Sequence, residues 1–297
     1  MAELAQAVSL SKSISRPTSP RLKLWEGLVL AGLAAWLYAP ILSRLIGQWW
    51  TDPNFSHGFF VPAFSFYVLW QNRARLQQIE PAPSLWGLPL IVFSVGVLVL
   101  GVFGVELFLS RISLLLLITG MVIFFLGWGM LRAVLFPLLF LVLMVPIPAI
   151  VFNHITFPLQ ILASKLSAWL LPLVGVPVFR EGNVINLPAM PLEVADACSG
   201  IHSLLSLTTL AIMYGYLLEK RISIRVVLAV ASIPIAVAAN ALRIVGTGLL
   251  VQYWDADKAQ GFFHEFSGWL IFVCSLLLLF AFHRCLALFE RRKEIAA

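Results

Sequence analysis

The sequence is poor in charged residues, which make up 11% of its 297 positions, whereas a soluble domain carries roughly a quarter. Hydrophobic residues make up 61%, and several apolar runs are about as long as the roughly 20 residues that cross a hydrocarbon core. So few charges cannot cover a water-soluble globule of this length. The shortage excludes a soluble enzyme and predicts an integral membrane protein.

Cysteine is also scarce. Only Cys198, Cys274 and Cys285 occur, so they cannot all pair, and the last two lie within one apolar run. No disulfide framework is therefore expected.

Motifs for metals and phosphates are missing as well. The chain has no HExxH, no CxxC, no glycine-rich phosphate loop and no GxSxG serine elbow, so neither a metal site nor a cofactor is expected. The net charge of +6 does not indicate nucleic acid, because the basic residues lie at the ends of apolar runs and form no single stripe with interleaved aromatics. The expected environment is the lipid bilayer.

What the chain does contain is a series of apolar runs separated by short polar turns. The runs predicted to span the membrane are 24–46, 57–71, 85–104, 109–128, 133–151, 199–218, 226–251 and 267–288. A ninth run, 155–176, places Thr156, Gln160, Ser164 and Ser167 on one helix face.

The charges of the turns orient these runs, because Lys and Arg gather on the cytoplasmic side. The turns 73–75 and 220–225 are basic, whereas the connections 180–197 and 253–263 carry acids and little Lys or Arg. If 155–176 crossed the bilayer, either the acidic connection 180–197 would lie inside or the basic turn 220–225 would lie outside. Neither position fits the charges. We therefore predict that it is an interfacial or re-entrant helix on the outer side.

The predicted fold is an all-α, polytopic transmembrane helical bundle of about eight spans plus that one helix, with both termini cytoplasmic. Residues 1–20 are expected to form a disordered cytoplasmic tail, 21–290 a single transmembrane domain, and 291–297 a basic cytoplasmic tail.

Arg243 is the clearest candidate for chemistry, because a charged side chain inside an apolar span is costly and indicates function by default. It lies about eight residues before the outer end of its span, and Asn240, three positions earlier, shares its helix face. A guanidinium there can reach toward the outer surface.

Two further reactive groups are predicted at the same outer level. Cys198 and Ser199 begin one span, and His264 directly precedes another. The amide donors at a helix N-terminus favour a thiolate, an imidazole can shuttle its proton, and a fixed guanidinium can stabilise an oxyanion. Cys198, Arg243 and His264 are thus predicted to form a catalytic set.

Other histidines also lie near the outer face. His202 follows Cys198 by four residues on the same helix and is the rival for the base, so the choice between His202 and His264 stays open. His57 can line a cavity at the outer face together with these residues.

The motifs around these residues resemble the exosortase/archaeosortase family. The resemblance rests on Ala197-Cys198-Ser199-Gly200-Ile201, on Asn240-Ala241-Leu242-Arg243, on His264 with Gly268, and on Ser56-His57-Gly58 upstream, in the family's order. His202 is a departure, since family members often have Arg or Asn at that position.

The resemblance implies a cysteine peptidase/transpeptidase of the bacterial cytoplasmic (inner) membrane with its site on the external side. Its substrate partners would be exported proteins with a C-terminal sorting signal, which consists of a short motif (Pro-Glu-Pro in the best-known branch), a transmembrane helix and a basic cluster. Cys198 would form a thioester, His264 would handle the proton and Arg243 would stabilise the oxyanion. The accepting nucleophile, the recognition motif and the oligomeric state are not identified.

Two other functions fit the residues. In a transporter or polysaccharide-handling membrane protein, Arg243 would bind an anionic lipid-linked substrate and Cys198 would be dispensable. In a non-enzymatic assembly subunit, Cys198, Arg243 and His264 would all tolerate substitution.

Overall fold

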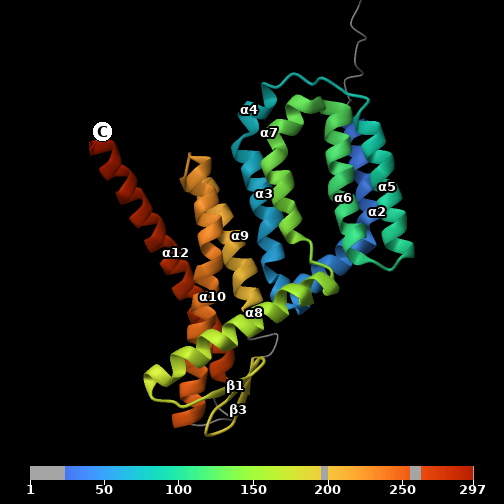
Figure 1. Ribbon diagram of the computed structural model, residues 1–297. Helices are drawn as coiled ribbons and strands as arrows, with labels where there is room; N and C mark the ends of the chain where they lie inside the picture. The colour runs from blue at the N-terminus through green and yellow to red at the C-terminus, as the bar shows by residue number, and fades with distance from the viewer. Residues whose placement is uncertain (1–23, 195–199, 255–261, 297) are drawn as a thin grey trace, which may run out of the picture. The chain divides into compact units, whose positions relative to one another are not determined.

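Helices make up most of the computed structural model, which describes residues 24–194, 200–254 and 262–296. The longer helices are α2 (Leu24–Thr51), α3 (Phe60–Gln71), α5 (Gly87–Phe103), α6 (Leu107–Met121), α7 (Gly127–Phe140), α8 (Ala149–Leu170), α9 (Ile201–Leu218), α10 (Ile222–Tyr253) and α12 (Phe262–Ala296) (Figure 1). Short helical segments are η1 (Pro53–Phe59), α4 (Arg73–Gln77), η2 (Val122–Leu126), η3 (Leu141–Met144) and η4 (Leu171–Val174).

Six stretches of the described residues are long and apolar enough to cross a membrane, and α5 is a shorter apolar helix. The prediction of a polytopic helical membrane protein is therefore confirmed as a class. The number of spans, the side on which the termini lie and the single-domain assignment remain predictions.

The contacts divide the chain into two compact units. One holds the described residues up to Leu45 together with Ser65–Val145, and the other holds Ile46–Phe64 and the described residues from Pro146 onward. Two of the three boundaries fall within α2 and α3, so each of these helices contributes to both units, and the third falls between η3 and α8.

In the first unit, α5 and α6 pack closely because small residues lie where they meet. A Cβ atom added at Gly101 would lie 2.5 Å from Ser110 Oγ, so only a residue without a side chain fits there. Tyr38 of α2 forms a 2.9 Å hydrogen bond with Ser113 of α6. This bond satisfies two hydroxyl groups that are fully buried.

Gly127 separates α6 from α7. Its φ is +85°, and an added Cβ atom would overlap the carbonyl oxygen of Ala82. Residues Leu107–Met144 form one apolar stretch of 38 residues, but this backbone turn makes two helices of it.

In the second unit, α9, α10 and α12 contact one another and share a hydrophobic core (Figure 1). This core consists of Leu207, Ala211, Ile224, Leu228, Ala236 and Leu279. A second hydrophobic core lies where α8 and α10 meet residues 171–194, the segment that follows α8.

Helix α8 buries all four polar residues that were predicted to share one face. Ser164 Oγ donates to the Gly182 carbonyl at 3.0 Å, and Ser167 Oγ donates to the Ala241 carbonyl at 3.1 Å. Trp169, on the opposite side of the helix, is exposed. Figure 1 shows α8 crossing α10 partway along that helix, which agrees with the bond from Ser167 to Ala241. Its relation to a bilayer stays a prediction.

A small antiparallel sheet follows α8, in a segment for which the sequence predicted only a loop. Its strands are β1 (Phe179–Glu181), β2 (Val184–Asn186) and β3 (Pro191–Glu193), in that order. Glu181 pairs with Val184, so Gly182 and Asn183 form a two-residue hairpin loop, and Gly182 has a φ of +61°. The all-α prediction is incomplete here, because the Gly-Asn hairpin signal was missed.

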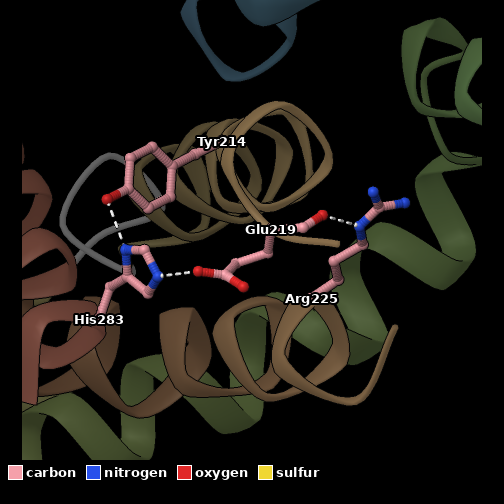
Figure 2. A network of polar contacts seen from close by, with 4 residues as sticks. All are labelled: Tyr214, Glu219, Arg225 and His283. Carbon is pink, nitrogen blue, oxygen red and sulfur yellow. Dashed lines mark hydrogen bonds and ion pairs between the residues drawn. The ribbon is translucent and has the colours of Figure 1, made fainter. Parts of the chain in front are cut away.

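A network of polar side chains joins α9, α10 and α12 at the turn between α9 and α10 (Figure 2). The two nitrogens of His283 each form a 2.7 Å hydrogen bond, one with Tyr214 and one with the carboxylate of Glu219. Arg225 Nε donates to the backbone carbonyl of Glu219 at 2.7 Å. We call these four residues the His283 network.

Candidate active site

The predicted site residues fall into two groups with respect to what the structure describes. His57, His202, Asn240 and Arg243 are described and belong to the second unit. Cys198 and Ser199 lie outside the described residues. The backbone of His264 lies in the first turn of α12, whereas its side chain is outside the description. The surroundings of Cys198 and His264 are therefore built from their described neighbours.

Gly200 brings the chain just after Cys198 against α10. It caps α9 with a left-handed backbone (φ +78°), and a Cβ atom added to it would lie 2.7 Å from Asn240 Cγ. Asn240 is buried, with 3% of its surface exposed. Both the backbone angle and the close approach require glycine.

Arg243 lies one helical turn beyond Asn240 on α10, and its guanidinium packs against the start of α12. A Cβ atom added to Gly268 would lie 3.3 Å from Arg243 Nη2. Gly268 follows His264 by one helical turn. The segment from Asn240 to Arg243 thus contacts one residue near Cys198 and one residue near His264.

Arg243 also lines a cavity of about 730 Å³. The rest of the lining is largely apolar and includes Gly246, Leu250 and Trp254 of the α10 end and Leu270 of α12. A cation in such surroundings interacts with an anionic group more strongly than it would in water.

His57 lies in η1, a turn built by local capping and close packing. The side chain of Asp52 accepts a hydrogen bond from the amide of Asn54 at 3.0 Å and caps the turn. A Cβ atom added to Gly58 would overlap the indole of Trp49. His57 is consequently held in place, with 8% of its surface exposed.

His202, on α9, interacts with residues of both η1 and α10. Its imidazole hydrogen-bonds to the backbone of Pro53, and the charges of Asp52 and Arg243 both act on it. His57 and His202 line one further cavity, of about 300 Å³. The three motifs that contain His57, His202 and Arg243 are therefore neighbours in space.

The same cavity contains residues that the sequence analysis missed. Ser206, Thr209 and Met213 follow His202 at intervals of four, three and four, and all of them line the cavity. This helical spacing was a usable signal, but half-polar helix faces are common in membrane proteins and none of these residues is charged.

The described part of the site offers the guanidinium of Arg243 and the imidazoles of His57 and His202. The cavity that the two histidines line is largely apolar, and the chain segments that hold Cys198 and His264 lie next to these residues. Such a set suits acyl transfer, in which a negative charge develops on a carbonyl oxygen and a proton must be moved.

Comparison with known proteins gives one finding. Residues 49–281 match the sequence model of a protein family described as transmembrane exosortase, and this range contains all of the motifs above. Neither a curated protein nor a solved structure matched the chain.

Proposed function

The chain belongs to the transmembrane exosortase family, and from this membership we propose that it is a membrane-embedded cysteine peptidase/transpeptidase. Its proposed substrates are exported proteins that end in a short motif, a transmembrane helix and a basic tail. We expect the enzyme to act in the bacterial inner membrane, on the external side.

One observation carries this proposal. Gly200, two residues after Cys198, packs on Asn240, and Gly268, four residues after His264, packs on Arg243. Asn240 and Arg243 are one turn apart on α10. These contacts support a reaction that uses a thiol, an imidazole and a guanidinium together.

In the proposed reaction, the Cys198 thiolate attacks the scissile carbonyl while His264 holds the thiol proton. The resulting oxyanion is stabilised by Arg243. The carbon–nitrogen bond then breaks, His264 passes its proton to the departing amine, and a thioester remains on Cys198. Water or another nucleophile attacks the thioester, gives up its proton to His264 and regenerates the thiol.

His202 is the second candidate for the base. Its Nδ1 is buried and has no hydrogen-bond partner among the described residues, so it retains a lone pair that can accept a proton. The variants His264→Ala and His202→Ala decide between the two. The base is the residue whose removal abolishes single-turnover formation of the thioester.

The central test replaces Cys198 with Ala and follows a protein from the same genome that carries the C-terminal signal. Processing should fall by at least about 100-fold, and uncleaved substrate should accumulate in the membrane. Cys274→Ala is the matched control, because Cys274 is an exposed thiol on α12 and has no proposed role. Normal processing by Cys198→Ala would rule out the thiol mechanism.

The cavity beside Arg243 favours one alternative, a protein that handles an anionic lipid-linked substrate without covalent chemistry. That function needs Arg243 and does not need Cys198. It predicts that Arg243→Ala abolishes the function of the protein and that Cys198→Ala leaves it intact.

A further inference from the structure

Helix α12 is continuous from Phe262 to Ala296, so a contact that fixes one part of it also fixes the rest. Gly268 packs on Arg243 of α10, and His264 lies one turn before Gly268. His283, further along the same helix, belongs to the His283 network. At the rise of an α-helix, about 28 Å separates His283 from His264.

The surface that α12 presents to α9 and α10 is mostly apolar. Leu279 is buried in the core that the three helices share, and Phe272, Leu276 and Phe282 pack against this core. Because lipid chains are as apolar as these side chains, no hydrophobic effect holds the helices together inside a membrane. Hydrogen bonds between the helices then gain importance for how they align.

His283 supplies such hydrogen bonds. Within residues 268–288, where the side chains of α12 are described, the buried polar side chains are Ser275 and His283. Ser275 Oγ donates at 2.7 Å to the Ile271 carbonyl, which belongs to α12 itself. His283 instead bonds to α9 and to the turn that follows α9 (Figure 2). Of these two residues, only His283 joins α12 to other elements.

One arrangement of protons satisfies all members of this contact. The Glu219 carboxylate accepts, so Nε2 of His283 donates to it, and Nδ1 of the neutral imidazole accepts from the Tyr214 hydroxyl. The Tyr214 ring also meets the ring of Phe280, at 4.8 Å between centroids, and Arg225 binds the Glu219 carbonyl. A shift of α12 would break both bonds of His283 and leave a buried imidazole without partners, which is costly.

We propose that His283 is a positioning residue, whose two hydrogen bonds fix the axial position and the rotation of α12 and thereby the place of His264 relative to Arg243. The proposal rests on the proposed function, because it takes His264 to serve the reaction. A slip of one residue along the helix axis would carry His264 by about 1.5 Å and turn it by about 100°. A misplacement of about 1 Å can slow a reaction by about 100-fold.

The first test measures the place of α12 by double electron–electron resonance on the full-length protein in nanodiscs, with the three natural cysteines replaced by Ser. Spin labels at the exposed residues Leu218 of α9 and Leu270 of α12 report movement of α12. A second pair, at Leu218 and the exposed Glu181, reports the rest of the second unit. His283→Leu should shift or broaden the first distance by at least about 1.5 Å and leave the second unchanged.

Three further variants sharpen this measurement. Ser275→Ala is the matched control, because it removes a buried polar group whose bond stays within α12, and it should leave both distances unchanged. His283→Gln keeps one donor and one acceptor in its amide and should preserve the first distance. Tyr214→Phe removes one hydroxyl and should broaden the first distance, which gives a second test if His283→Leu does not fold.

The second test measures kcat and KM for cleavage of the signal-bearing substrate, with the natural cysteines in place. His283→Leu should lower kcat by at least about tenfold and change KM by less than about threefold, because His264 moves a proton and does not bind substrate in the proposed reaction. Ser275→Ala and His283→Gln should stay within about threefold of the unmodified protein. A role in stability alone would lower the unfolding temperature and leave kcat of the folded protein unchanged.

Three results would overturn the proposal. Unchanged distances in His283→Leu and Tyr214→Phe would mean that the network does not position α12. A shifted distance with unchanged kcat would mean that the place of α12 does not matter for the reaction. A lower kcat with unchanged distances would assign His283 a different role. The distances are measured without Cys198, so they do not depend on whether it is the nucleophile, and failure of the proposed function shows separately, as normal processing by Cys198→Ala.

Discussion

Glycine positions define the candidate site at the scale of single residues. Gly200 and Gly268 contact Asn240 and Arg243, where a side chain at Gly200 would clash with Asn240 and one at Gly268 would crowd the Arg243 guanidinium. These contacts have no chemistry of their own. They set how closely the chain near Cys198 and the start of α12 approach α10.

The first prediction concerns Gly200→Ala. The new Cβ atom meets Asn240, and the left-handed backbone disfavours alanine by about 1 to 2 kcal/mol, so the free energy of unfolding should fall by at least that amount. Thermal unfolding in detergent measures the effect. Gly246→Ala is the control, because nothing lies within 4 Å of its Cβ position, and it should be neutral or slightly stabilising. Equal unfolding temperatures for the two variants would contradict the packing described for Gly200.

The second prediction concerns Arg243→Lys. Lysine keeps the charge but lacks the planar fork of donors, so an oxyanion loses its fixed partner. Processing of the substrate should fall by about 100-fold while the protein stays folded. Quantitative immunoblotting of cleaved and uncleaved substrate provides the measurement. Full activity of this variant would mean that only the positive charge matters.

The sequence could predict some residues and not others for physical reasons. Asn240 and Arg243 were identified because polar groups inside an apolar run are costly. Arg111 of α6 meets the same criterion but was missed, since it lies near the edge of its predicted span. It has 3% of its surface exposed, and Glu106, which caps the same helix, supplies the nearby opposite charge.

At the scale of elements, α8 shows what a periodic pattern can and cannot reveal. The spacing of its polar residues predicted one face correctly, because a helix repeats every 3.6 residues. The pattern did not identify the partners of that face, which are backbone carbonyls of Gly182 and Ala241. The hairpin that contains Gly182 was missed since each strand has only three residues.

The third prediction tests the His283 network. His283→Ala removes the hydrogen bonds to Tyr214 and Glu219, so the free energy of unfolding should fall by about 1 to 3 kcal/mol. Cys285→Ala, an exposed position two residues further along α12, is the control and should have little effect. If both variants unfold at the same temperature, the network does not contribute to stability.

At the scale of the whole molecule, the topology remains to be tested. In a background without the natural cysteines, Glu181→Cys in the β1–β2 hairpin should react with a membrane-impermeant thiol reagent applied to intact cells. Arg221→Cys in the turn between α9 and α10 should not react. Both side chains are exposed, so accessibility to water does not differ between them. The reverse labelling would mean that α8 crosses the bilayer.

The division into two units has a practical meaning for protein engineering. Of its three boundaries, the one at Val145/Pro146 lies between η3 and α8, whereas the other two, at Leu45/Ile46 and at Phe64/Ser65, lie inside continuous helices. A chimaera that grafts one unit onto a homologue must therefore splice helix to helix in register. One inserted or deleted residue at either junction would rotate everything beyond it by about 100°. Only chimaeras that keep the number of residues in both spliced helices should be functional.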